Sequence, residues 1–132
     1  MPLTFDLPLE DLKLYQGISP KPVGFERYWA EALAELDTLD PRIELVPAGF
    51  ETDFAECFFL YFTGVGGARI EAKYVRPKGV AGRHPAVVQF HGYAGSIGDW
   101  ADGPMLGLAA QGMSCFGLNC RGQGGRSEDT GP

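Results

Sequence analysis

The sequence lacks any run of basic residues that would form a nucleic-acid-binding stripe. It has 11 lysines and arginines against 17 aspartates and glutamates, and its formal net charge is −6. The first part is the more acidic one: residues 1–56 hold twelve acids and four bases, whereas residues 57–132 hold five acids and seven bases. We therefore expect no nucleic acid among the partners.

Long apolar runs are also missing. The longest one, Cys57–Phe62, is far shorter than the ~20 residues that a membrane helix needs. The N-terminal residues MPLTFDLPLEDL contain neither a basic segment nor an apolar run suited to export. We expect no membrane partner and no signal peptide.

Cysteine is scarce and odd in number, with only Cys57, Cys115 and Cys120. Cys115 and Cys120 stand five positions apart on one expected strand and its exit, so their side chains point to opposite faces and a disulfide between them is not expected. Three free thiols favour a reducing, cytoplasmic location.

What is present is enough for a globular protein with tight turns. Hydrophobic residues make up 45% of the 132 residues, which supports a packed core. Glycine (19 residues) is about twice as frequent as in ordinary proteins, but no period indicates collagen or low complexity.

The first forty residues are predicted to be helical. Asp6 is placed to cap a short helix that ends near Leu14, with Pro8 in the first turn, where a missing N–H costs little. A second helix is predicted over residues 24–38, because apolar residues recur there at helical spacing. These are Phe25, Trp29, Leu33 and Leu36. We expect this stripe to pack beneath the strands that follow.

Strands are predicted next, at 43–46, 54–62 and 68–76. In the last of these, Ala, Ile, Ala and Tyr alternate with Arg, Glu and Lys. Three glycines between residues 62 and 68 predict that the second and third strands form an antiparallel hairpin.

From residue 86 the pattern becomes that of an α/β unit. AVVQF at 86–90 is typical of a strand buried on both faces of a parallel sheet. A helix at 105–111 and a strand at 113–118 follow, and strand–helix–strand in about 35 residues predicts a parallel βαβ unit. The fold class is therefore α/β, in which the loops at the carboxyl ends of the parallel strands hold the site.

The loop after the first parallel strand begins His91-Gly92-Tyr93. A glycine there lets the backbone turn sharply and aim N–H groups at developing negative charge, as an oxyanion hole requires. In α/β-hydrolases one such N–H comes from the loop after the third strand, often in an HG motif. The alternative is an ordinary turn in which the backbone satisfies the histidine, and for HG alone that alternative is favoured.

The loop after the second parallel strand reads RGQGG from Arg121 to Gly125. Its glycines suit a tight turn, and Arg121 can pair with a carboxylate or with main-chain carbonyls. It is not a phosphate loop, because neither the P-loop spacing nor a dinucleotide fingerprint is present. Each motif is weak alone, but two such loops in this order are much less frequent by chance.

The sequence resembles the N-terminal part of the acetyl xylan esterase / cephalosporin C deacetylase family of α/β-hydrolases. The matching segments are FDLPLEDLKLY at 5–15, FERYWAEALAE at 25–35, FTGVGGARIEAKYVRPKG at 62–79, HPAVVQFHGYAG at 84–95, and RGQGG with SEDT at 121–130. The resemblance implies that residues 1–132 are the N-terminal portion of one α/β-hydrolase sandwich. Residues 1–40 would be its helical extension, and 41–132 its first strands with the oxyanion loop.

The resemblance also implies an activity. It is the removal of acetyl groups from acetylated xylan, xylo-oligosaccharides and similar small esters such as cephalosporin C, by a Ser-His-Asp triad. It implies no metal, no organic cofactor, and a homo-hexamer that encloses the active sites.

By the same resemblance, particular residues acquire roles. Tyr93, beside Gly92, gives a backbone N–H to the oxyanion hole, and its ring lines the acetyl pocket. His91, Arg121 and Gln123 are supporting residues, the last two bracing the nucleophile loop. Two departures stand out: the loop from Ala94 to Trp100 is shorter than in some members, and Asn119 occupies a position where many α/β-hydrolases have an acid.

A nucleophile elbow, G-x-S-x-G, is absent from the sequence. The nearest match, at Ser96, follows the wrong strand. His84 is expected in a surface turn, and His91 has no serine partner. Asp99 and Asp102 are expected to be turn or helix-start residues. We therefore expect the triad downstream of residue 132 and expect these 132 residues alone to be inactive.

Two alternatives remain open. One is a truncated, non-catalytic relative that keeps only the acetyl pocket and acts as a binding protein. The other is a hydrolase of a different acyl substrate, such as a peptidase or lipase. A downstream G-x-S-Q-G followed by Asp and His separates the enzyme from the binding protein.

Overall fold

The computed structural model describes residues 6–101 and 103–131, and the contacts within it divide the chain into two units, Met1–Ala34 and Glu35–Pro132. The chain begins with helix α1, Leu9–Leu14. Pro8 occupies its N-cap, and the Asp6 carboxylate instead accepts the N–H of Leu7 at 2.8 Å. The predicted capping role of Asp6 is therefore wrong, because its side chain folds back on the adjacent residue.

Helix α2, Phe25–Asp37, confirms the helix predicted over 24–38. No described residue of α2 is buried, and Trp29 and Leu33 are 49% and 55% exposed. Helical periodicity predicted the local structure of this segment correctly, and the packing of its apolar stripe beneath the strands stays a prediction.

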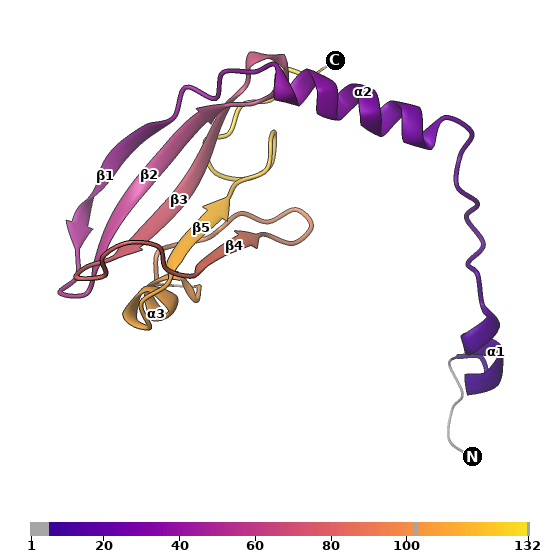
Figure 1. Ribbon diagram of the computed structural model, residues 1–132, viewed down its shortest axis with the longest axis horizontal. Coiled ribbons are helices and arrows are strands. Elements are labelled where there is room, and N and C mark those ends of the chain that lie inside the picture. The colour runs from indigo at the N-terminus through magenta and orange to yellow at the C-terminus, as the bar shows by residue number, and fades with distance from the viewer. Residues whose placement is uncertain (1–5, 102, 132) are drawn as a thin grey trace. The chain divides into compact units, whose positions relative to one another are not determined.

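The second unit contains a five-stranded sheet with the order β1-β2-β3-β5-β4, shown in Figure 1. Its strands are β1 Glu44–Glu51, β2 Ala55–Thr63, β3 Arg69–Pro77, β4 Ala86–Phe90 and β5 Ser114–Leu118. Strands β2 and β3 form the predicted antiparallel hairpin, which turns through the short 3₁₀ helix Val65–Gly67. Strand β1 is longer than predicted because an irregularity between Pro47 and Glu51 lets it continue along β2.

Strands β4 and β5 are parallel and are joined through helix α3, Met105–Ala110, which confirms the βαβ unit. The expectation that β4 is buried on both faces is wrong for the described residues. Val88 and Phe90 are 57% and 64% exposed, whereas the alternate residues Val87 and Gln89 are half-buried. The second face of β4 lies open because α3 and the residues buried against it lie on the other face of the sheet.

That core gathers between the sheet and α3. Its buried members are Ala55, Cys57, Val75, Ile97, Met105, Ala109 and Cys115. All three cysteines are free thiols. Within residues 6–101 and 103–131, no helix has the length and apolar character needed to cross a membrane.

Candidate functional site

The loop after β4 makes a tight turn directly beyond His91. The N–H of Gly95 donates to the carbonyl of Gly92 at 3.1 Å, so Tyr93 and Ala94 are the central residues of a β-turn. Ala94 has φ of 53°, a left-handed conformation that costs an alanine energy. The central N–H groups of such a turn take no part in its closing hydrogen bond, so the Tyr93 N–H is available to a ligand.

His91 joins this loop to the end of β5. Its Nε2 accepts the N–H of Cys120 at 3.1 Å, and its Nδ1 lies 2.8 Å from the carbonyl oxygen of Gly92. Because a backbone N–H can only donate, Nε2 is the acceptor and the proton resides on Nδ1. Both ring nitrogens are therefore engaged by backbone, and His91 holds two loops together.

The loop continues across the sheet, over the face that carries the core. Ile97 lies over β5 so closely that a Cβ on Gly117 would come within 2.8 Å of its side chain. Farther along, the Trp100 ring packs edge-on against Phe59 of β2 and Phe50 of β1, at 5.4 and 5.5 Å between centroids. The segment 96–100 thus spans the strands from β5 to β1.

The RGQGG loop packs directly against this segment. A Cβ on Gly124 would lie 2.4 Å from the Cβ of Ser96, and φ of Gly124 is +53°. Within the same loop the backbone N–H of Gln123 donates to the carbonyl of Cys120 at 3.0 Å. Glycine at position 124 is therefore required on two grounds, the space between the loops and the backbone conformation.

Arg121 stabilises the RGQGG loop through two contacts. Its guanidinium Nε lies 3.3 Å from the Asp129 carboxylate, and its Nη1 donates to the carbonyl of Val65 in the hairpin turn at 3.3 Å. Both kinds of partner expected from the sequence, a carboxylate and a main-chain carbonyl, are present. A hollow beside Arg121 is lined by Phe62, Gly64, Val65, Ile70 and Leu118.

A buried polar network joins the ends of these loops. The Glu71 carboxylate, on β3, receives hydrogen bonds from Tyr61 at 3.0 Å and from the Asn119 amide at 3.3 Å. Glu71 and Asn119 are 4% and 3% exposed. The hydroxyl of Ser127 accepts the N–H of Glu71 at 2.9 Å and donates to the carbonyl of Asn119 at 2.7 Å.

Glu71 was not among the predicted site residues. Many α/β-hydrolases have an acid at the position of Asn119, and here the neighbouring strand places the Glu71 carboxylate beside that asparagine. Charged residues at 71 and 73, two apart on a strand inside a sheet, were the available signal. Their burial depends on loops that are far away in the sequence.

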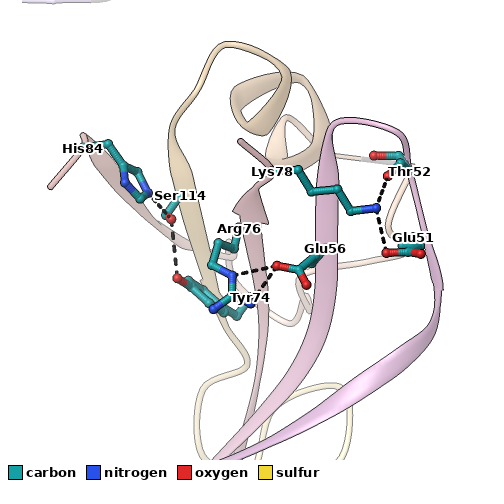
Figure 2. Close-up of polar contacts among 8 residues, drawn as sticks. All are labelled: Glu51, Thr52, Glu56, Tyr74, Arg76, Lys78, His84 and Ser114. Atoms are coloured by element: carbon teal, nitrogen blue, oxygen red, sulfur yellow. Dashed lines mark hydrogen bonds and ion pairs between the residues drawn. The ribbon is translucent and has the colours of Figure 1, made fainter. Parts of the chain in front are cut away.

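A serine–histidine contact occurs at the opposite ends of the parallel strands (Figure 2). His84 Nε2 lies 2.8 Å from the Ser114 hydroxyl, which also lies 3.4 Å from the Tyr74 hydroxyl. The other ring nitrogen, Nδ1, contacts the carbonyl of Gly82 at 3.1 Å and no carboxylate. Ser114 is only 6% exposed, and this partly buried chain of hydrogen bonds anchors the start of β4 to β5.

The remaining candidate residues are turn residues. The Ser96 hydroxyl accepts the N–H of Gly98 at 3.2 Å, and the Asp99 carboxylate accepts the N–H of Trp100 at 2.6 Å. Asp102 lies outside the described residues. Across 6–101 and 103–131, neither histidine contacts a carboxylate and no His, Cys, Asp and Glu side chains cluster as metal ligands do.

Together, an antiparallel hairpin that passes into a parallel βαβ unit, with glycine-containing loops after both parallel strands, defines the N-terminal portion of an α/β-hydrolase sheet. A family model described as acetyl xylan esterase (AXE1) matches residues 1–132. The chain belongs to the acetyl xylan esterase family.

Two solved structures show the same arrangement. Acetyl xylan esterase 1 from Thermoanaerobacterium sp. JW/SL YS485 is 50% identical, with a TM-score of 0.87 over 96% of this chain. An acetyl xylan esterase from Paenibacillus sp. R4 is 27% identical, with a TM-score of 0.79 over 93% of this chain. The chain spans 39% of the length of each of these two proteins.

Proposed function

We propose that this chain is the N-terminal part of a serine-type carbohydrate esterase that removes acetyl groups from acetylated xylan or xylo-oligosaccharides. The observation that carries the proposal is the turn at Gly92–Gly95, which stands at the carboxyl end of a parallel strand and presents the Tyr93 N–H. The 50% identity with an acetyl xylan esterase over nearly the whole chain supports the substrate class.

The chemistry assigned to these residues is stabilisation of charge. When a serine hydroxyl attacks the acetyl carbonyl, the carbonyl oxygen becomes an anion, and the Tyr93 N–H donates a hydrogen bond to it. Gly92 permits the turn that aims this donor. His91 holds the turn against the end of β5, and Arg121 and Gln123 brace the neighbouring loop on which the nucleophile would rest.

The nucleophile, the acid and the base are proposed to come from downstream sequence. The nucleophile strand would add to the free edge of β4, and its serine would follow in a G-x-S-x-G elbow. The proposed mechanism is acyl transfer through serine, which uses no metal and no organic cofactor.

Several finer features belong to the same proposal. Small acetyl esters such as cephalosporin C would be accepted, because the family resemblance implies a pocket sized to the acetyl group. The free thiols Cys57, Cys115 and Cys120 favour a cytoplasmic location. Assembly into a homo-hexamer rests on the family resemblance alone.

The test is an assay of the intact protein, expressed with its downstream sequence. We expect release of acetate from acetylated xylo-oligosaccharides and from p-nitrophenyl acetate, and a much slower reaction with the butyrate and octanoate esters. Preference for long acyl chains or for peptides would replace this proposal with a lipase or peptidase. No hydrolysis of any ester, with binding of acetylated sugar retained, would identify a binding protein.

A further inference from the structure

Strand β3 carries two charged side chains on the buried face of the sheet. Glu71 and Lys73 are only 4% and 8% exposed. Removing charges from water is costly unless each finds partners, so the identity of those partners indicates what the two residues do.

Glu71 acts on the loop after β4 through Asn119. The Asn119 amide nitrogen donates to the Glu71 carboxylate at 3.3 Å, and this orients the amide oxygen toward the loop, where it accepts the buried N–H of Ile97 at 2.9 Å. The same carboxylate is 3.9 Å from the guanidinium of Arg126, which follows the RGQGG glycines. One carboxylate thus links both loops of the site.

Lys73 holds the same loop one residue farther along. Its ammonium donates to the carbonyl of Gly98 and lies 4.8 Å from the centroid of the Trp100 ring. Lys73 therefore contacts Gly98 and Trp100 directly, whereas Glu71 reaches Ile97 only through the Asn119 amide. The Ile97 side chain, 5% exposed, adds an apolar anchor in the core.

We propose that Glu71 and Lys73 are positioning residues that set the geometry of residues 91–100 and thereby aim the Tyr93 N–H. The inference rests on the proposed function, because it treats this N–H as an oxyanion donor. Neither residue contacts the substrate. Their effect is to stabilise the transition state, because a Tyr93 N–H that is already held in place needs no reorganisation when the oxyanion forms.

The test uses two substitutions in the intact protein, the second of which is designed to compensate for the first. Asn119→Asp places a second carboxylate against Glu71, and repulsion between like charges displaces the side chain that holds Ile97. Adding Glu71→Gln restores the hydrogen bond between the two side chains in the reverse direction. The new amide at position 71 donates to the new carboxylate at position 119, and that carboxylate can still accept the Ile97 N–H.

We expect Asn119→Asp to lower kcat per titrated active site by about 10–100-fold, the scale that misplacement of a catalytic group produces. KM should change by less than about threefold, because the loss falls on the transition state rather than on substrate binding. The double substitution should recover most of kcat. Lys73→Met, which keeps most of the unbranched side chain but removes the ammonium, should lower kcat similarly, and it serves as the second probe if Asn119→Asp does not fold.

Glu56→Gln is the matched control. Glu56 also carries a carboxylate on this sheet and pairs with Arg76 at 2.6 Å, as Figure 2 shows, but its position in β2 lies on the face of the sheet opposite Glu71 and Lys73. Its substitution should leave kcat unchanged. Values of kcat within about twofold of the unsubstituted protein in both Asn119→Asp and Lys73→Met would overturn the proposal, as would a double variant no more active than Asn119→Asp.

Amide hydrogen exchange separates this inference from the proposed function. The Ile97 N–H should exchange about fivefold faster or more in Asn119→Asp, as expected when one hydrogen bond is lost, and should recover in the double variant. This readout does not require ester hydrolysis. If the unsubstituted protein hydrolyses no ester, the proposed function fails, while unchanged exchange at Ile97 would reject the positioning role by itself.

Discussion

His91 illustrates how a single side chain can organise a site without transferring a proton. One nitrogen of its ring accepts a backbone N–H from the second loop, and the other bonds the carbonyl of Gly92 within the first. A histidine directly before a glycine turn is easily assigned as a catalytic general base. The hydrogen bonds show a bracing role instead, since neither nitrogen is left to accept a proton from a nucleophile.

Substitutions at Tyr93 distinguish its backbone from its side chain. If the N–H stabilises the oxyanion, Tyr93→Phe leaves the donor in place and should keep most of kcat. If the Tyr93 ring, which is exposed in these 132 residues, lines the proposed acetyl pocket of the intact protein, Tyr93→Ala should mainly raise KM and relax the preference for acetyl over longer acyl groups. Steady-state kinetics of the intact protein with acetate and butyrate esters measure both effects.

Tyr93→Pro removes the N–H itself and is the positive control. Loss of one oxyanion donor typically lowers kcat by ~10²–10³-fold, and circular dichroism should first establish that this variant is folded. A loss of that size in Tyr93→Phe would instead make the hydroxyl the catalytic group.

The three thiols should differ in reactivity. Burial raises the pKa of Cys57 and Cys115 above the ordinary value, although Lys78 partly offsets the shift at Cys57. A raised pKa leaves less thiolate at pH 8, so these two thiols should react slowly with Ellman's reagent, and the half-buried Cys120 should react first. Peptide mapping identifies the modified residue, and the denatured protein, in which all three react, is the control. Equal rates in the native protein would contradict the buried positions.

At the scale of elements, the site is an interface between two loops. The segment 91–100 lies across the sheet, and the RGQGG loop fits against it where only glycine leaves room. The parallel strands hold the starting points of both loops side by side. The packing between the loops, rather than either motif alone, sets the distance between the Tyr93 turn and the second loop.

Gly124→Ala tests this packing. The new methyl group would overlap Ser96, and alanine would have to adopt a left-handed backbone, so we expect the free energy of unfolding to fall by about 2–5 kcal/mol. Gly107→Ala, in α3, is the matched control. A Cβ there meets nothing within 4 Å, and alanine in a helix should be neutral or stabilising by up to about 1 kcal/mol. Chemical denaturation of the intact protein measures both, and equal stability of the two variants would contradict the close approach of the loops.

How far the sequence predicts each feature depends on how local its cause is. The helix at Phe25–Asp37, the hairpin and the βαβ unit follow from periodicity and from glycine punctuation, and all three were predicted. The burial of Glu71 and Lys73 was not, because it results from loops more than twenty residues away folding over β3. The half-buried His84 was missed for the same reason, since its partner Ser114 lies thirty residues downstream.

In the whole sheet, α3 covers one face, and strand β4 exposes the large apolar side chains Val88 and Phe90 on the other. Exposed apolar surface of this kind marks positions that other protein segments cover, and a free parallel edge strand invites pairing.

We therefore expect residues 1–132, expressed alone, to bind a hydrophobic dye such as anilinonaphthalene sulfonate or to aggregate. The intact protein should bind little dye, because downstream strands and helices would cover the same surface. Dye fluorescence and light scattering of the two proteins make the comparison. A monomeric 132-residue protein that melts cooperatively without binding dye would contradict this account of the sheet.

We propose that these loops supply the oxyanion side of a serine esterase whose nucleophile follows a further strand. The most direct measurement is labelling of the intact protein with a fluorophosphonate, followed by mass-spectrometric identification of the modified residue during loss of acetyl esterase activity. We expect one modified serine, outside residues 1–132 and within a G-x-S-x-G sequence, with activity lost in proportion to labelling. A label on Ser96 or Ser114, or full acetyl esterase activity with no serine labelled, would contradict it.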